Sequence, residues 1–342
     1  MNEPPLAARR SRAKTVFTIT LAIVGAVLLV VTVRRVGWSN VQHGFAQVGW
    51  WFVVVLILGG VRFAARARAW MASAEGVLQH TSHSAPSSSS HAALRTPHFF
   101  GAVLAGDALG NLTPLGLLAS EPAKIVLVRD RLPTVAAITS VAVENVFYIG
   151  SIVAMLAAGA VVFITVTALP AGLRAGVRVV LAGAAASAII AAVVARHQPA
   201  VLSRLAHLLS ALTGRGQTSS DRLTEIETQF YRMLTWPAHR LARVMTWEAV
   251  FHLAAVTEVW LVLRLLPGGS AASVADAFVL ETTGRLIAVV FKFVPYRLGV
   301  DEAGTALVAT TLAIDPTAGV TLALIRRMRI LCWDAVGLLV LA

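Results

Sequence analysis

The residues of this chain that are best suited to chemistry are acidic side chains within long apolar stretches. Nine of its 17 Asp and Glu residues lie there: Asp107, Glu121, Glu144, Glu248, Glu258, Glu281, Asp301, Glu302 and Asp334. A charge at the centre of a bilayer costs roughly 2.5–3.5 kcal/mol on insertion scales, so these acids are expected to face a bundle interior or a cavity. Cationic side chains that could pair with them lie in the same stretches: Lys124, Arg285, Lys292, Arg297, Arg326, Arg327 and Arg329. The set can pair between helices, bind a charged ligand or carry protons; for Glu258 and Asp334 we favour simple pairing.

Two proline-interrupted segments carry the same motif. Pro114 is followed after six residues by Glu121, and Pro295 is followed in the same way by Glu302, so that the two motifs are offset by 181 positions. Proline and glycine free backbone groups that hydrocarbon cannot satisfy, so a broken helix at membrane depth must be buried in protein or face a wet cavity. The pattern predicts two broken re-entrant helical hairpins in an internal repeat.

Each half-helix that begins after a proline would present unpaired N–H groups and the positive end of its dipole, which suits a phosphate or carboxylate. Glu121 and Glu302 are expected about two turns into these half-helices, where they could pair with Lys124, Lys292 or Arg297, meet a cationic headgroup, or carry a proton. Paired discontinuous helices indicate a transporter site near the bilayer midplane. The predicted substrate path comprises Asp107, Asn111, Pro114, Glu121, Lys124, Glu144, Arg285, Lys292, Pro295, Arg297, Asp301 and Glu302. No catalytic residue, metal ligand or cofactor is predicted.

The composition sets the class of protein in which these residues must be held. The chain has 342 residues, 57% hydrophobic and only 13% charged, with a net charge of +12, and a mean hydropathy of +0.75. A soluble domain is about 25% charged, so a water-soluble enzyme is excluded together with a disordered chain. The single Cys332 excludes an intramolecular disulfide. We therefore predict an all-α polytopic membrane protein.

About six full spans are predicted besides the two broken segments. The spans are expected at 16–33, 48–61, 134–166, 177–194, 244–265 and 318–342, and the broken segments at 98–131 and 278–312. The whole chain, 1–342, is expected to form a single membrane domain. Two polar excursions are predicted to be cytoplasmic: a linker at 73–97, and a basic loop at 196–243 whose leucine spacing over 202–212 predicts an amphipathic helix.

The basic residues predict the orientation of the chain. Four cationic residues precede the first span, and Arg62, Arg66 and Arg68 follow the second, so the positive-inside rule places the N-terminus in the cytoplasm of a multi-pass protein of the cell (inner or plasma) membrane. Nucleic-acid binding is disfavoured because the arginines are spread among loops without aromatic stacking platforms. Histidines in the linker could bind a metal, but their irregular spacing favours a flexible loop.

The two motifs also resemble a known family. The sequence Asn111-Leu-Thr-Pro, followed by Ser120-Glu-Pro-Ala-Lys124, and the sequence Pro295-Tyr-Arg-Leu-Gly-Val-Asp-Glu302 are similar to motifs of the membrane region of lysylphosphatidylglycerol synthases and its stand-alone, flippase-like relatives. The resemblance implies a membrane protein that moves a lipid or lipid-linked molecule between leaflets. It does not extend to aminoacyl transfer, because the soluble domain that performs it has no counterpart in these residues.

The motifs depart from the family pattern at three places. Residues 115–119 replace most of the family's glycines, Lys124 replaces arginine, and Tyr296-Arg297 replaces Gly-Gly. Bulkier residues could narrow or redirect the hairpins. The identity of the substrate is therefore not carried over from the family.

Three classes of function remain open at this point. In the favoured one, Arg285, Lys292 and Arg297 attract the anionic headgroup of a membrane lipid, while no nucleic acid is bound. An intramembrane enzyme could instead use Asp107 or Asp301 as a general base on a lipid or polyprenyl carrier, although no metal, phosphate-loop or ATP motif accompanies them. The third is a non-transporting membrane subunit, whose charges should all be mutually paired without a cavity.

Overall fold

The structure is a computed structural model, and the description below covers the following residues: 30–31, 34, 38–81, 94–112, 116–201, 203–204, 217–292, 294 and 297–341. Among these residues all regular secondary structure is helical and no strand occurs. The predicted all-α class is therefore confirmed. The predicted span at 16–33 and the predicted amphipathic helix at 202–212 fall largely outside the described residues.

The helices begin where the sequence carries helix-start signals. In chain order they are α2 (Trp38–Val48), α3 (Trp51–Thr81), α4 (Thr96–Leu112), α5 (Gly116–Val128), α6 (Thr134–Val166), α7 (Ala171–His197), α9 (Gln217–Arg232), the 3-10 helix η2 (Met233–Thr235), α10 (Ala238–Leu265), α11 (Val274–Val290), α12 (Val300–Thr311) and α13 (Pro316–Leu341). Pro133, Pro170 and Pro237 immediately precede α6, α7 and α10. Helix α11 begins with a capping box in which Ser273 and Asp276 bond each other's backbone N–H groups.

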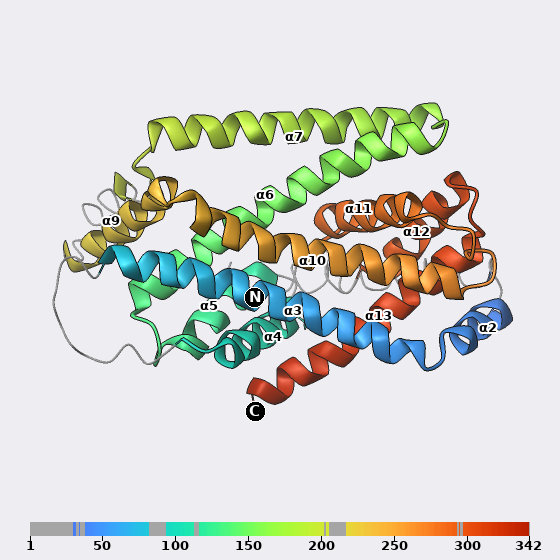
Figure 1. Cartoon of the computed structure of the whole chain (residues 1–342), viewed down its shortest axis with the longest axis horizontal. Coiled ribbons are helices and arrows are strands. Elements are labelled where there is room, and N and C mark those ends of the chain that lie inside the picture. The colour runs from blue at the N-terminus through green and yellow to red at the C-terminus, as the bar shows by residue number, and fades with distance from the viewer. Residues whose placement is uncertain are drawn as a thin grey trace, which may run out of the picture.

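Helices α6 and α7 are the clearest membrane spans of the described residues. They have 33 and 27 residues, so at 1.5 Å per residue both exceed the roughly 30 Å of the hydrocarbon core. Helix α7 lies outermost (Figure 1) and leaves Val179, Ile189 and Ile190 exposed, as expected for a lipid-facing helix. The spans predicted at 134–166 and 177–194 correspond to these two helices.

A third span is possible by length and composition if α2 and α3 are taken together. The two helices are bent by 77° at Gly49, whose φ of +40° suits a residue without a Cβ atom. Helices α3, α10 and α13 have 31, 28 and 26 residues, but charged residues within them lower their apolar character. Their length is sufficient to cross a bilayer.

The first broken segment forms a helical hairpin of α4 and α5, called the first hairpin below. Helix α4 ends at Leu112 and α5 begins at Gly116, both within the broken segment predicted at 98–131. The two helices run antiparallel and pack closely, since a Cβ atom added to Gly116 would lie 2.6 Å from the carbonyl oxygen of Gly110. Small residues at this contact allow the backbones to approach each other. The prediction of a broken helix at 98–131 is confirmed.

The second broken segment forms the second hairpin, α11 and α12. Helix α11 ends at Val290 and α12 begins at Val300, so the break at 291–299 is longer than in the first hairpin. Gly304 of α12 faces the side chain of Ile287 of α11, with 2.3 Å between an added Cβ atom and Cδ1. The described helices are therefore interrupted at both predicted places.

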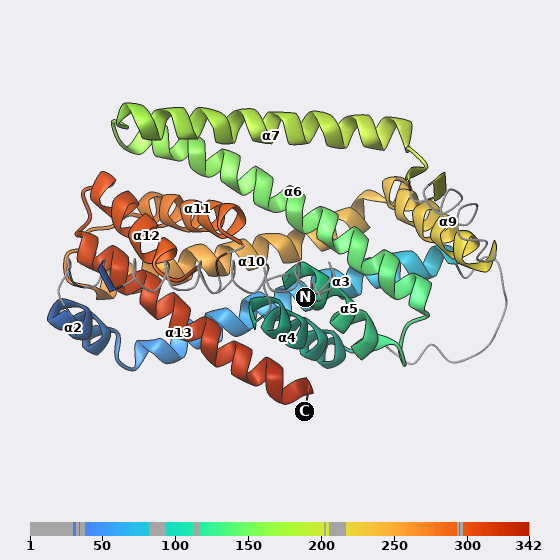
Figure 2. The same cartoon turned by 180° about the vertical axis from the view of Figure 1, so that it is seen from behind.

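The order of a long helix, a hairpin and a long helix occurs twice along the chain. It comprises α3, the first hairpin and α6, and then α10, the second hairpin and α13. Helices α3 and α10 lie side by side and antiparallel (Figures 1 and 2), joined by Arg62–Glu258 at 3.2 Å and Arg243–Glu75 at 2.8 Å. The two units thus run in opposite directions.

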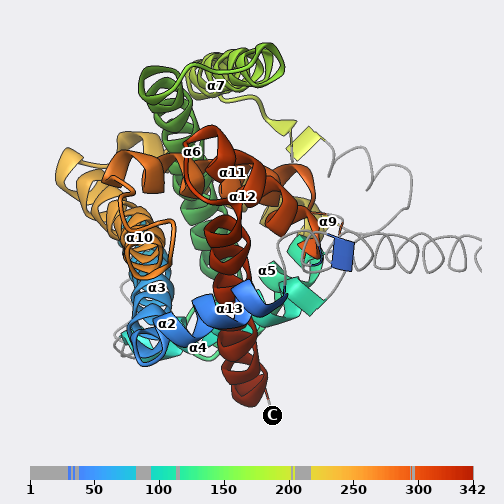
Figure 3. The same cartoon turned by 90° about the vertical axis from the view of Figure 1, so that its right-hand side faces the viewer.

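Helix α13 lies in the middle of the molecule in the end-on view (Figure 3). Its Gly337 packs against the first hairpin, where an added Cβ atom would lie 2.5 Å from the carbonyl oxygen of Leu104, and its Gly319 packs against the carbonyl of Thr305 in the second hairpin. The indole of Trp333 donates a hydrogen bond to the carbonyl of Leu56 in α3. One helix therefore contacts both hairpins and α3.

Two apolar clusters flank a polar region along α3. Val55 belongs to a large cluster formed with α6, α7, α10, α11, α12 and α13. Ala67 and Trp70, further along α3, belong to a second cluster formed with α4, α5 and α6. Arg62 and Arg66 lie between these two clusters, so the fold places both arginines in its interior.

Two predicted boundaries are corrected by the structure. Helix α3, which contains most of the span predicted at 48–61, continues past the arginines to Thr81, so the linker predicted at 73–97 is helical at its start. Gly76 in this extension packs against the ring of Trp236, and this contact holds the end of α3 in the bundle. The basic loop predicted at 196–243 contains α9, η2 and the start of α10.

The packing of α6 on α11 can be tested with two glycines of α6. A Cβ atom at Gly159 would lie 2.3 Å from Oγ1 of the buried Thr282, whereas one at Gly150 would meet nothing within 4 Å. Alanine raises helix propensity by about 0.8–1 kcal/mol at either site, but overpacking costs about 1–3 kcal/mol. We expect Gly159→Ala to lower the thermal unfolding temperature in detergent and the matched control Gly150→Ala to keep or raise it. Equal shifts for the two variants would contradict this packing.

Candidate functional site

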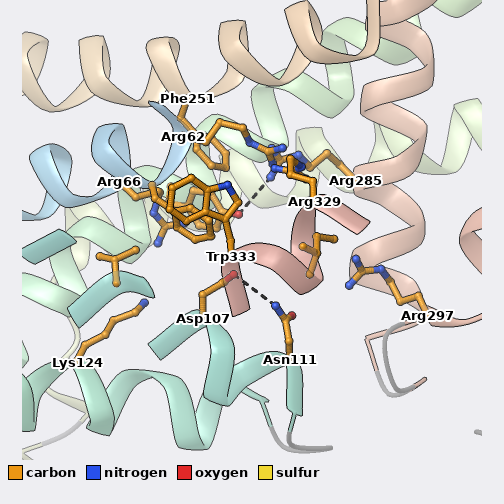
Figure 4. Close-up of a pocket in the computed structure, with 14 residues that line it drawn as sticks. Arg62, Arg66, Asp107, Asn111, Lys124, Phe251, Arg285, Arg297, Arg329 and Trp333 are labelled. Carbon is orange, nitrogen blue, oxygen red and sulfur yellow. Dashed lines mark hydrogen bonds between the residues drawn. The ribbon is translucent and has the colours of Figure 1, made fainter. Parts of the chain in front are cut away.

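A cavity of about 220 Å³ lies between α3, the first hairpin, α10, α11 and α13 (Figure 4). Its lining contains six cationic side chains: Arg62, Arg66, Lys124, Arg285, Arg297 and Arg329. Asp107 is the one acidic residue in that lining. The surface that a ligand would meet is therefore strongly positive.

A second cavity of about 120 Å³ adjoins the first. The two share Arg62, Asn111, Arg285, Arg297, Arg329 and Ile330. The second cavity adds Arg326, Arg327 and Asp301, which lie toward α12. Both hairpins thus contribute side chains to one polar region.

Three guanidinium groups converge at the upper part of the cavity in Figure 4, from Arg62 of α3, Arg285 of α11 and Arg329 of α13. Glu258 of α10 forms ion pairs with two of them, with 3.2 Å to Arg62 Nη1 and 3.0 Å to Arg329 Nε. The side chains of Arg62, Arg285 and Arg329 are only 12%, 11% and 7% exposed. Positively charged groups that lie this close together and away from solvent require negative charge nearby.

A second buried glutamate completes this group. Glu281 of α11 pairs with Arg285 Nε at 2.8 Å and with Arg326 Nη2 at 2.6 Å. We call the six residues the four-arginine cluster: Arg62, Arg285, Arg326 and Arg329 with Glu258 and Glu281. Each of the two carboxylates is shared by two arginines.

Aromatic rings support the arginines from α6 and α10. Phe251 lies under two guanidinium groups, with 5.0 Å from its ring centroid to Arg62 Cζ and 4.6 Å to Arg285 Cζ. Tyr148 lies 3.5 Å from Arg66 Cζ, and its hydroxyl accepts from Arg285 at 3.3 Å. Cation–π contacts of this kind hold a guanidinium in place without neutralising it.

At the other end of the cavity each cation has its own acid. Arg66 pairs with Glu144 at 2.7 Å, and Lys124 pairs with Glu121 at 2.9 Å. Glu144 is almost fully buried. Positive charge is therefore balanced one to one at this end.

The hairpins are linked to α13 by further polar contacts. Asn111, at the end of α4, donates to Asp334 at 3.0 Å and to Asp107 at 3.4 Å. Near the start of α12, Glu302 pairs with Arg327 of α13 at 2.8 Å. These contacts hold the broken ends of both hairpins against the same helix.

Most of the nine acids predicted to lie in the interior are paired. Six take part in ion pairs: Glu121, Glu144, Glu258, Glu281, Asp301 and Glu302. Glu248 accepts from Ser151 at 3.3 Å, and Ser151 also lies 2.9 Å from His252 Nε2. Pairing between helices, favoured for Glu258 and Asp334, is observed for Glu258, whereas Asp334 accepts hydrogen bonds from Asn111 and forms no ion pair with the described residues.

The structure brings most of the predicted substrate path together. The larger cavity is lined by Asp107, Asn111, Lys124, Arg285 and Arg297, and the adjoining one by Asp301. Glu121, Glu144 and Glu302 act as partners of cations at the cavity. Lys292 is exposed and absent from the linings of these two cavities. Pro114 and Pro295 lie outside the described residues.

The position predicted for Glu302 is wrong. Because α12 begins at Val300, Glu302 lies in its first turn and not two turns in, and its partner is Arg327 in place of Lys292 or Arg297. Arg297 pairs instead with Asp301 at 3.1 Å. Two acids in the first turn already satisfy the positive end of the dipole, so this helix start is not suited to a further anion.

Sequence reasoning missed Arg62, Arg66, Phe251 and Trp333 as site residues. The two arginines were interpreted as markers of the cytoplasmic end of a span, because the apolar run stops there. Their i, i+4 spacing places both on one face of a helix, and the helix-forming sequence that follows them was the available signal. Arg329 was predicted as a partner for acids but not as part of the site.

The shared carboxylate of Glu258 offers a test of this network. Glu258→Gln would leave two buried guanidinium groups without their anion, and breaking a buried ion pair costs about 3–5 kcal/mol. We expect a strong fall in thermal unfolding temperature in detergent. The matched control Asp130→Asn removes an acid from an exposed pair with Arg129 and should change stability little. A fall no larger than that of the control would argue against the network.

Comparison with known proteins places the chain in a family. The family model described as "Lysylphosphatidylglycerol synthase TM region" matches residues 17–333. A search of curated protein sequences and a search of solved structures each found no match. The matched region contains both hairpins and every residue that lines the two cavities, and it ends at Trp333 within α13. The chain belongs to the lysylphosphatidylglycerol synthase TM-region family of membrane proteins.

Proposed function

We propose that this protein is a lipid flippase or transporter that moves a membrane lipid, or a lipid-linked molecule, with an anionic headgroup between leaflets. The observation that carries the proposal is the cavity lined by six cations and one acid. Such a lining lowers the free energy of an anion and raises that of a cation. The protein would act in the cell membrane with its N-terminus in the cytoplasm, bind no nucleic acid, and catalyse no chemical reaction.

The arrangement of the helices supports transport. The two units of long helix, hairpin and long helix run in opposite directions, as in transporters with inverted repeats, whose substrate sites lie between the repeats. We propose that α3, α10 and α13 cross the membrane with α6 and α7, and that the two hairpins re-enter it around the cavity. The buried charges of α3, α10 and α13 then face the path and not the lipid.

The cavity also has an apolar side. Phe63, Val103, Ile330 and Trp333 line it together with the cations, and the rings of Phe63 and Trp333 are 5.6 Å apart. A free inorganic anion would gain little from these side chains, whereas the first part of an acyl or prenyl chain would bury apolar surface against them. The lining thus supports an amphipathic ligand.

The contacts at the hairpin ends are suited to gating. Asn111–Asp334 joins the first hairpin to α13, and Glu302–Arg327 joins the second hairpin to the same helix. A passing headgroup can replace one partner of such a pair and so loosen one hairpin at a time. Glu121 and Glu302 would gate the path in this way or couple it to a proton.

The two other classes of function have less support. An enzyme would need a free base, and Asp107 is the acid of the larger cavity that could serve; turnover of a lipid by purified protein would favour that class. For a non-transporting subunit we expected mutually paired charges and no cavity. The charges are largely paired, but the described helices are interrupted and a cavity is present.

Reconstitution in liposomes tests the proposed function. We expect wild-type protein to move fluorescent phospholipids with anionic headgroups between leaflets, measured by dithionite quenching, faster than protein-free vesicles and faster than it moves phosphatidylcholine. Arg62→Gln should reduce this movement by about tenfold or more, since one lost charge contact of about 1.4 kcal/mol is a factor of ten. The matched control Arg178→Gln, on the exposed surface of α7, should behave as wild type.

The same assay has a clear contrary outcome. If wild type and Glu302→Ala both match protein-free vesicles for every headgroup in a broad lipid panel, the flippase proposal fails.

A further inference from the structure

The positive charge around the cavity is unevenly balanced. Away from the four-arginine cluster, the cations of the larger cavity pair one to one: Arg66 with Glu144, Lys124 with Glu121, and Arg297 with Asp301. Within the cluster, four arginines share two carboxylates. Counted by ion pairs, the cluster has two more arginines than carboxylates, while Asp107 is the acid that lines the larger cavity.

The arginines that carry this surplus are largely buried and border the two cavities. Arg285 is buried, and its Nη2 has no hydrogen-bond partner among the described residues. Nε of Arg62 is likewise buried without a hydrogen-bond partner there. Both residues line both cavities. Unused charged donors that border a cavity indicate a place for acceptor oxygens.

The geometry of the donors favours a phosphate group. Guanidinium groups bind phosphate oxygens through pairs of parallel N–H bonds, and three of them converge here from α3, α11 and α13 (Figure 4). A terminal phosphate, that is a phosphomonoester, has about 1.5 to 2 negative charges at pH 7 and three strong acceptor oxygens. A phosphodiester headgroup has one negative charge and would leave part of the surplus unpaired.

We propose that the four-arginine cluster binds a terminal phosphate dianion, so that the ligand is a lipid ending in a phosphomonoester. The inference rests on the proposed function, which it narrows from anionic headgroups in general to this class. The phosphate lies on Arg62, Arg285 and Arg329, and the apolar lining at Trp333 receives the start of the chain. Free phosphate shares the charge chemistry but lacks the chain.

Binding measurements on the full-length protein in nanodiscs of phosphatidylcholine test this assignment. The probes are short-chain phosphatidic acid, short-chain phosphatidylglycerol and inorganic phosphate. Their binding is measured by the change in tryptophan fluorescence or by isothermal titration calorimetry. We expect phosphatidic acid to bind about tenfold tighter than phosphatidylglycerol, because it matches the second charge, and inorganic phosphate to bind far more weakly than either lipid. Equal affinities for the two lipids would overturn the assignment, and so would inorganic phosphate binding as tightly as phosphatidic acid.

The variant Arg326→Gln tests the effect of the cluster's charge separately from the effect of direct contacts to the phosphate. Arg326 pairs with Glu281 but is absent from the lining of the larger cavity, so its loss reduces the surplus to one charge and leaves the three converging guanidinium groups in place. The preference for phosphatidic acid over phosphatidylglycerol should then fall toward one, while Arg178→Gln keeps the wild-type ratio. An unchanged ratio of the two affinities in Arg326→Gln would contradict the charge argument. If that variant fails to fold, the affinities of the wild-type protein for phosphatidic acid and phosphatidylglycerol decide whether the assignment holds.

The two proposals fail in different ways. Movement of phosphatidylglycerol between leaflets without any preference in binding would overturn the terminal-phosphate assignment and leave the flippase intact. Selective binding of phosphatidic acid without movement of any lipid would support the site and overturn transport.

Discussion

Two buried carboxylates, each shared by two arginines, are the interaction on which the rest of this structure depends. Glu258 of α10 joins α3 to α13 through Arg62 and Arg329, and Glu281 joins α11 to α13 through Arg326. A buried charge without its partner is strongly unfavourable, so these contacts determine which helices lie side by side. The same contacts leave positive charge in excess beside a cavity, and this connects the fold to binding.

The broken helices follow from the same constraint. A backbone that leaves the helix at membrane depth needs polar surroundings, and a described helix end beside each break contacts a charged side chain of α13. Asn111 at the end of the first hairpin meets Asp334, and Glu302 at the start of α12 meets Arg327. A continuous span would need no such neighbours. Both hairpins therefore contribute polar side chains to one region beside α13.

Those parts of the fold and of the site that have a local signal could be predicted from the sequence. Helix α6 has the predicted bounds of 134–166 because prolines, apolar content and length agree, and both breaks were marked by proline and glycine. The course of α3 was missed because hydropathy falls at Arg62, although the following residues favour a helix. Which acid pairs with which cation is set by packing between distant segments, so the partner of Glu302 could not be deduced from spacing alone.

A cryo-EM map of the protein in nanodiscs that contain phosphatidic acid is the most direct measurement of the central claim. We predict headgroup density between the guanidinium groups of Arg62, Arg285 and Arg329, with its chain along Phe63 and Trp333 and with both hairpins interrupted around it. A map in which these arginines contact only carboxylates, with no headgroup density and a closed cavity, would contradict the account.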